Sequence, residues 1–219
     1  MKMHLNAAFC LLPLLAVLSK GTVMVNLTEE VRQYIVTQNK SGDIVSFGLT
    51  DDYWKQGEHP SGEYPISVHV ESLKCASTDD GDQVGVRYPK CEEDLGLFIT
   101  HGLQAPFDLN TTFKFPLIGQ RTSKETTEAK INLNNERMIF ESFDTLRGTP
   151  NWKDCNFIAR VVFSGYFAYH KRGPDEGLED GQDYSAPVTV LANSTRNLIQ
   201  EGDTLVYNIT GSYTQTLCL

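Results

Sequence analysis

The stretch CNFIARVVFSGYFAYHK, residues 155–171, alternates apolar and polar side chains over almost its whole length. A period of two places the apolar side chains on one face of a strand and the polar ones on the other. β-Branched and aromatic residues suit a pleated, half-buried surface, and Gly165 marks a place for a bulge or a bend. A strand this long needs antiparallel neighbours and a second layer over its apolar face. The stretch therefore predicts an all-β domain.

Other segments repeat this pattern. YPISVHVESLKC (64–75) puts Ile66, Val68 and Val70 on one face, and GLFITHGL (96–103) and LVYNITGSYTQTLCL (205–219) also predict strands. Turn signals recur at the spacing of a sandwich or barrel, with little helical periodicity. We predict one domain over residues 22–219, an antiparallel β-sandwich or flattened β-barrel of roughly ten strands.

Local patterns predict several further elements. NLTEEVRQ (26–33) fits one helical turn capped by Thr28, and YIVTQ (34–38) and IVSFGLT (44–50) fit a hairpin across NKSGD. AKINLN and RMIFESF fit a second hairpin across Asn134 and Asn135. VTVLA (188–192) fits a strand. We expect turns or loops at 51–63, 76–83, 142–152 and 173–183.

Residues 1–21 have the layout of a secretory signal peptide. Lys2 and His4 precede an apolar run from Ala7 to Leu18, and small residues at Ser19 and Gly21 suit cleavage before Thr22. A membrane anchor is the alternative, but a span needs roughly 20 apolar residues and Pro13 interrupts this shorter run. Cleavage removes 21 of the 219 residues and leaves 198, enough for one well-filled domain. We expect a secreted, extracellular protein.

Four of the five cysteines remain after cleavage, namely Cys75, Cys91, Cys155 and Cys218. An even number in an exported chain predicts two disulfides, with three possible connectivities. We favour Cys75–Cys91 and Cys155–Cys218, because the second bond would join the start of the long strand to the end of the last one. Zinc is the alternative, but no pair has C-x₂-C spacing.

Asn-x-Ser/Thr occurs five times, and no proline stands in the middle position. Five such sequences behind a signal peptide predict N-glycosylation and a eukaryotic secretory route. A glycan must project into solvent, so these positions also map the surface. The acceptor residues are Asn26, Asn39, Asn110, Asn193 and Asn208.

The net charge of −9 excludes some partner classes. Loss of Lys2 and Lys20 with the signal peptide makes the charge more negative by two. Phosphate backbones and anionic lipids repel such a chain, so we expect neither nucleic acid nor membrane as a partner. A basic partner or a cation is electrostatically easier to bind.

Catalytic and cofactor motifs are missing from the sequence. There is no G-x-S-x-G, H-E-x-x-H, P-loop or dinucleotide-binding glycine pattern. The four histidines beyond residue 21 lie far apart, and we interpret His59, His69, His101 and His170 as solvent-facing or hydrogen-bonded residues. We therefore expect no metal, no cofactor and no catalytic residue. A pair of carboxylates for glycoside cleavage stays an alternative.

Two loops carry the residues that we expect to bind a partner. Tyr53, Trp54 and Trp152 fall in predicted loops, where aromatic side chains either anchor interfaces or pack back onto the core. The loop at 173–183 is acidic; it is either solvated, binds calcium or docks on a basic patch of a partner. Its acidic residues are Asp175, Glu176, Glu179, Asp180 and Asp183.

PISVHVESLKC (65–75) and DCNFIARVVF (154–163) resemble strand segments of secreted poxvirus immune-evasion proteins, which are β-sandwiches that bind cytokines or chemokines. The resemblance covers about twenty residues of general strand pattern. It implies a sandwich that binds a protein, and we assign the chain to no family on it.

The sequence thus predicts a secreted, disulfide-stabilised N-glycoprotein that acts without catalysis by binding an extracellular partner. We expect that partner to be a protein, held by loops 51–63 and 173–183. One alternative is a small-ligand carrier with a barrel cavity, lined by the face of Phe157, Phe163 and Phe167. A secreted hydrolase that uses carboxylates is the other.

Overall fold

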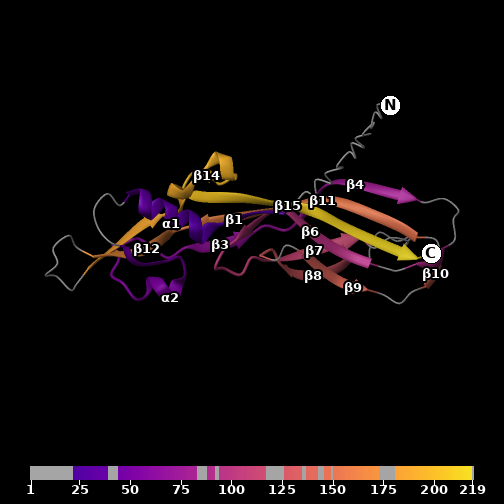
Figure 1. Ribbon diagram of the computed structural model, residues 1–219, viewed down its shortest axis with the longest axis horizontal. Coiled ribbons are helices and arrows are strands. Elements are labelled where there is room, and N and C mark those ends of the chain that lie inside the picture. Colours follow the sequence, from indigo (N-terminus) through magenta and orange to yellow (C-terminus); the bar gives the residue numbers. More distant parts are fainter. Residues whose placement is uncertain are drawn as a thin grey trace, which may run out of the picture.

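The computed structural model shows an elongated molecule built mainly of strands (Figure 1). It describes residues 22–38, 44–82, 88–91, 94–116, 126–134, 137–142, 146–148, 150–172 and 181–218. For some residues in these ranges the structure describes only the backbone, among them Cys75, Cys91, Trp152 and Cys218. The signal peptide predicted for residues 1–21 lies outside the described residues.

Two long strands form the axis of the molecule. β11 (Pro150–Ser164) and β15 (Thr204–Cys218) pair antiparallel over their full 15-residue lengths. β11 alternates as predicted, because Cys155, Phe157, Ala159, Val161 and Phe163 are all buried. The predicted strand ends at Gly165, whose φ of 97° breaks it. β12 (Tyr166–Lys171) then continues into another sheet.

The central sheet has eight strands. Its other members are β1 (Val23–Asn26), β3 (Ser67–Val70), β4 (Lys74–Asp82), β6 (Asp94–Gln104), β9 (Arg137–Ser142) and β14 (Ile199–Glu201). Apart from the parallel pair β1–β6, its strand pairs are antiparallel. Two antiparallel pairs stand beside it: β5 (Tyr88–Cys91) with β10 (Leu146–Gly148), and β7 (Asn110–Pro116) with β8 (Thr126–Asn132). The all-β prediction is confirmed, with fifteen strands described.

A continuous core lies under the central sheet. Phe157 and Phe163 pack there with Tyr207 and Tyr213, all at most 1% exposed. The hydroxyl of Tyr207 donates to the carbonyl of Gly102 at 3.0 Å, which satisfies its polar end. Burial raises the pKa of Tyr213. The aromatic face that could have lined a barrel cavity is therefore packed core.

A smaller, three-stranded sheet forms one end of the molecule, in the order β13 (Gln182–Pro187), β12, β2 (Ile44–Gly48). Successive side chains of β12 point to opposite faces. Phe167 faces α1 (Leu27–Gln38), because its ring meets that of Tyr34 edge-on at 5.8 Å. Ala168 and His170 face α2 (Asp51–Trp54) and the segment after it, whose residues share a cavity with them. α1 and α2 lie on either side of this sheet in Figure 1.

Helix α1 corrects the hairpin predicted for residues 34–50. YIVTQ forms its last turns rather than a strand. Leu27, Val31 and Ile35 are fully buried at a spacing of four, which is the helical period that aligns one face with the sheet. The cap is Asn26 rather than Thr28, since Asn26 Oδ1 accepts from the amide of Glu29 at 3.2 Å.

Four other local predictions are wrong, and in the first three of them strand pairing overrides local propensity. The acidic turn expected at 76–83 is part of β4, held along β11. Trp152, placed in a loop, lies in β11 opposite Thr216. The strands of the second predicted hairpin pair elsewhere, β8 with β7 and β9 with β6. VTVL is the 3₁₀ helix η1 (Val188–Leu191), followed by η2 (Ser194–Arg196).

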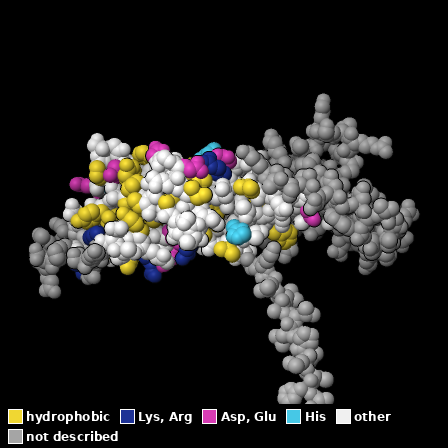
Figure 2. Space-filling view, turned by 90° about the horizontal axis from the view of Figure 1, so that it is seen from above, with side chains coloured by type: hydrophobic (Ala, Val, Ile, Leu, Met, Phe, Trp, Pro, Cys, Tyr) yellow, Lys and Arg dark blue, Asp and Glu magenta, His cyan; other side chains and the backbone are white. Residues whose placement is uncertain are grey.

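The described side chains form no large continuous apolar patch in the view from above. Figure 2 shows small groups of hydrophobic side chains toward the end that carries α1, separated by polar atoms. Exposed apolar residues include Val36, Val190 and Ile199. Among the described residues, no helix has the length and apolar character needed to cross a bilayer.

Candidate functional site

A polar row crosses the face of the three-stranded sheet that α2 covers. The strand register places Ser46 opposite His170, and His170 opposite Asp183. Side chains directly opposite on one face of a sheet lie about 5 Å apart at Cβ, close enough to interact. Three residues that are 13 to 137 positions apart in sequence therefore meet on one surface.

His170 and Asp183 form a hydrogen-bonded pair in this row. The Nδ1 of His170 lies 2.7 Å from Oδ1 of Asp183, and the amide of Glu58 donates to Oδ2 at 3.0 Å. The hydrogen bond from His170, and then that from the Glu58 amide, lower the pKa of Asp183. Asp183 is thus a carboxylate at neutral pH, and His170 donates to it through Nδ1.

The segment that contains α2 folds over this row. The hydroxyls of Tyr53 and Ser46 are 2.7 Å apart, and the ring of Tyr53 packs on Gly48 so closely that a side chain there would collide with it. Trp54 stacks on His59 with ring centroids 3.6 Å apart. His59 Nε2 also donates to the carbonyl of Trp54 at 2.8 Å. The two aromatic residues predicted to bind are therefore partly buried and fix this segment on the sheet.

A small cavity remains between the segment and the sheet. Its volume is about 160 Å³, less than a drug-sized ligand requires. Most of its lining carries hydrogen-bonding groups. The described residues that line it are Ser46, Tyr53, Gln56, Gly57, His59, Ala168, Tyr169, His170 and Asp183, and we call it the α2 pocket.

The α2 pocket has the composition of a binding site rather than of a metal centre. Asp183 is the one carboxylate in its described lining, and no Lys or Arg belongs to that lining. Within the described parts of the chain, no group of three or more His, Cys, Asp and Glu residues is arranged to hold a metal ion. The pocket can accept hydrogen bonds and carries one negative charge.

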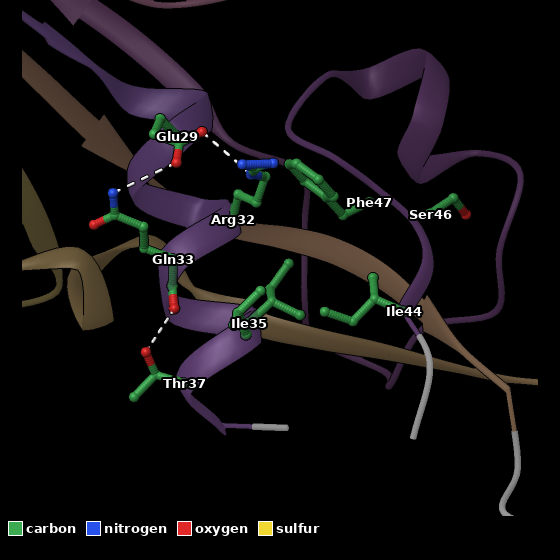
Figure 3. Close-up of a pocket in the computed structure, with 9 residues that line it drawn as sticks. Glu29, Arg32, Gln33, Ile35, Thr37, Ile44, Ser46 and Phe47 are labelled. Carbon is green, nitrogen blue, oxygen red and sulfur yellow. Dashed lines mark hydrogen bonds and ion pairs between the residues drawn. The ribbon is translucent and has the colours of Figure 1, made fainter. Parts of the chain in front are cut away.

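A groove lies on the opposite face, between α1 and β2 (Figure 3). Its volume is about 790 Å³. Ile35 from α1 and Ile44 and Phe47 from β2 point toward one another across it, and Arg32 lies near the ring of Phe47. Arg32 pairs with Glu29 at 3.2 Å, which leaves the groove apolar at its centre and charged at one end.

The structure unites some of the predicted binding residues and separates others. Tyr53 and Asp183 both line the α2 pocket, and Trp54 stacks on His59, which also lines it. Trp152 lies near the end of the molecule marked C in Figure 1, through its position opposite Thr216. Asp175, Glu176, Glu179 and Asp180 lie outside the described residues.

Sequence reasoning did not assign four polar side chains of the pocket to a site: Ser46, Gln56, His59 and His170. The sequence predicts both histidines to be solvent-facing or hydrogen-bonded, and each is hydrogen-bonded. The signal that could have found His170 is its alternation phase, which puts it on the polar face with Ser164. Its partner depends on the β12–β13 register, which local patterns do not reveal.

The four glycosylation sites that the structure describes line neither hollow. Asn26, Asn110 and Asn208 are exposed and Asn193 is half-buried, and none of them lines the α2 pocket or the groove. Asn208 lies in β15 between buried Tyr207 and Ile209, as predicted. Asn39 lies outside the described residues. N-glycosylation stays a prediction.

The register corrects one proposed disulfide. Cys155 lies opposite Tyr213, whereas Cys218 lies opposite Pro150, five positions along β11. At about 3.4 Å per residue their backbones are roughly 17 Å apart, and a disulfide needs Cα atoms within about 7 Å. The Cys155–Cys218 pairing is therefore wrong. The side chains of Cys75 and Cys91 are outside the description, so disulfide formation itself stays a prediction.

No protein-family model matches the chain, and no curated protein matches it in sequence. Among solved structures, the chain resembles one in the crystal structure of the Cry23Aa1 and Cry37Aa1 binary protein complex, with a TM-score of 0.50 and 15% identity over 91% of this chain and 86% of that one. A non-toxic crystal protein from Bacillus thuringiensis gives 0.47 and 10% over 90% and 94%. At this identity the first likeness supports the all-β fold alone.

Proposed function

We propose that this protein is a secreted glycoprotein that binds an extracellular protein without catalysing a reaction. Its contact surface is the α2 end: the α2 pocket and the exposed side chains of residues 51–59 and 182–187. The observation that carries this proposal is the convergence of two segments, far apart in sequence, on one polar hollow. Binding residues commonly lie on loops that a rigid sheet positions.

The geometry of the row favours binding over catalysis. Asp183 and His170 are bonded as in a catalytic dyad, but a nucleophile must lie within hydrogen-bond reach of the base. The hydroxyl of Ser46 bonds to Tyr53, and no hydrogen bond among the described residues joins it to His170. A side chain at Gly181 would collide with Nε2 of His170, so the backbone at Gly181 runs close to that nitrogen. A hydrolase with two carboxylates would need a second acid, and the described lining has only Asp183.

Secretion and glycosylation belong to the proposal. The basic, apolar and small-residue layout of residues 1–21 supports export. The exposed acceptors Asn26, Asn110 and Asn208 leave the α2 pocket uncovered. We further propose that disulfides among the four remaining cysteines stabilise the exported domain, as is typical of this compartment.

A capture experiment tests where the partner binds. The mature glycoprotein is immobilised and exposed to the fluid into which it is secreted, and bound proteins are identified. Gln56→Trp fills part of the α2 pocket from an exposed position, and Gln200→Trp makes the same change at an exposed position of β14 that lines neither hollow. We expect Gln56→Trp to reduce capture at least tenfold and Gln200→Trp to leave it unchanged. Equal capture by both variants and the wild type would contradict the proposal.

The groove between α1 and β2 supports a second candidate, a carrier of a small apolar ligand. Its volume of about 790 Å³ lies within the range of ligand sites. Ile35, Ile44 and Phe47 offer an apolar wall of the kind such sites have. Native mass spectrometry of the protein from its own source would show a retained ligand, and Ile44→Trp would displace it. A ligand-free mass would count against the carrier.

A further inference from the structure

We infer that the α2 pocket receives a single cationic side chain, a lysine or an arginine, from the partner protein. This inference rests on the proposed function and specifies its chemistry. The evidence is the balance of hydrogen-bond donors and acceptors in the pocket, its charge and its size.

The pocket is rich in acceptors. A backbone carbonyl can only accept, so the bond between His59 and the Trp54 carbonyl fixes the proton on Nε2 and leaves Nδ1 as an acceptor. That Nδ1 atom is buried and has no partner. Gln56 donates its Nε2 to the carbonyl of Asp52 at 3.0 Å, so its Oε1 also remains an acceptor. Each oxygen of Asp183 accepts one bond and has capacity for another.

Free donors are scarce in the same place. Ser46 and Tyr53 share one hydrogen bond between their hydroxyls, so one of their two protons is already used. The ring nitrogen protons of His59 and His170 are both committed, to a carbonyl and to a carboxylate. A ligand that fits this inventory brings several donors, as an ammonium or guanidinium group does.

Charge selects a cation over a neutral donor. The hydrogen bonds from His170 and from the Glu58 amide keep Asp183 ionised, and they lower its pKa. The covering segment adds Asp51, Asp52, Glu58 and Glu63 against one cation, Lys55, which pairs with Asp51. The surroundings of the pocket are therefore acidic, which attracts a basic partner and repels an acidic one.

Size and aromatic lining limit the guest to one side chain. The volume of about 160 Å³ is roughly half the lower limit for small-molecule sites. Tyr53 lines the pocket, and aromatic faces stabilise cations within about 6 Å. The described charged groups that face the pocket are the carboxylate of Asp183 and, when protonated, the imidazoles of His59 and His170.

Peptide titrations test the inference directly. The probes are blocked five-residue peptides with four glycines and a central lysine, arginine, norleucine or glutamate, together with free N-acetylglucosamine. Binding is followed through the Cε1–H NMR signals of His59 and His170 at about pH 7.5, above the ordinary imidazole pKa. We expect the lysine or arginine peptide to shift both signals and to bind at least tenfold more tightly than the norleucine peptide. Equal binding of lysine and norleucine peptides, or a response to the sugar alone, would overturn the inference.

Two variants separate this inference from the proposed function. Asp183→Asn keeps the size of the side chain and removes its charge, and we expect it to abolish the preference for lysine over norleucine. Gln56→Lys places an ammonium group of the protein itself at the pocket, with Gln56→Met as its neutral control. We expect Gln56→Lys alone to block the cationic peptide. If Gln56→Trp abolishes partner capture while Gln56→Lys and Gln56→Met capture equally well, the partner binds there without a cation and only this inference fails.

Discussion

His170 Nδ1 lies 2.7 Å from Asp183 Oδ1, and this bond joins the two strands whose connecting segment is rich in acidic residues. The same carboxylate accepts the amide of Glu58, so one residue ties β12, β13 and the segment after α2 together. The site depends on this arrangement, because it fixes both the charge of Asp183 and the position of the segment over the sheet.

Asp183 should make stability pH-dependent on the acid side. The pKa of Asp183 is lowered in the folded protein. Its contribution to the free energy of unfolding is therefore complete above the pKa of an unfolded aspartate, about 3.9, and is lost as the pH falls through the folded pKa. We expect Asp183→Asn to lower the free energy of unfolding by about 1 kcal/mol near pH 7, because the bonds are charge-assisted but partly exposed.

Denaturant unfolding of both proteins near pH 7 and at about pH 2 measures this difference. The cost of Asp183→Asn should shrink toward zero at the acid end, where the wild-type carboxyl is also neutral. Asp203→Asn, at an exposed turn, is the control with little effect at either pH. A cost that is the same at both pH values would contradict the account.

Alternation along β11 predicts that substitutions on its two faces differ in their cost to the free energy of unfolding. Phe163 is fully buried, so Phe163→Ala should lower the free energy of unfolding by about 3–5 kcal/mol. Ile158 is 42% exposed on the other face, so Ile158→Ala should cost less than about 1 kcal/mol. Thermal or denaturant unfolding distinguishes the two. Comparable losses at both positions would mean that the strand is not two-sided.

Gly165 should tolerate no side chain. Its φ is 97°, and a Cβ there would lie 2.5 Å from the carbonyl oxygen of Pro65. We expect Gly165→Ala to lower the free energy of unfolding by about 2–4 kcal/mol, through both backbone strain and collision. Gly202 has a φ of 63° with open space around it, so Gly202→Ala isolates the backbone cost of about 1 kcal/mol. Equal losses would show that the contact with Pro65 is unimportant.

Peptide mapping without reduction checks the cysteine correction. The register puts Cys155 and Cys218 five positions out of step, so no peptide should join them. Cys75 lies on β4 opposite Phe157, two positions from Cys155, and is the nearest described cysteine position on a neighbouring strand. Detection of a Cys155–Cys218 peptide would mean that β11 and β15 pair in another register.

Strand periodicity predicted the centre of the fold and little of its ends. In β11 and β15, many consecutive residues alternate, so the burial pattern is strong and tertiary structure follows it. In YIVTQ, the β-branched residues favour a strand. Leu27, Val31 and Ile35, however, recur every four residues, which is the helical spacing, and their burial against the sheet stabilises the helix. In β4, aspartates that favour a turn lie along β11 instead, because ladder pairing outweighs local preference.

The candidate site was predictable only in part. Aromatic and acidic composition pointed to residues 51–63 and to Asp183, and these do meet. His170 belongs to the site because of the β12–β13 register, and His59 because of a hydrogen bond to a backbone carbonyl. Neither feature can be predicted from sequence composition. The groove between α1 and β2 was missed because the sequence predicts a strand for residues 34–38, which form the last turns of α1.

Hydrogen–deuterium exchange with and without the captured partner tests the site most directly. Amides that a partner covers or rigidifies exchange more slowly. Binding should slow exchange in residues 51–59 and 182–187 and leave α1, on the opposite face of the sheet, unchanged. Slower exchange confined to α1 or to the β7–β8 pair, with residues 51–59 unaffected, would contradict the assignment of the α2 end as the binding surface.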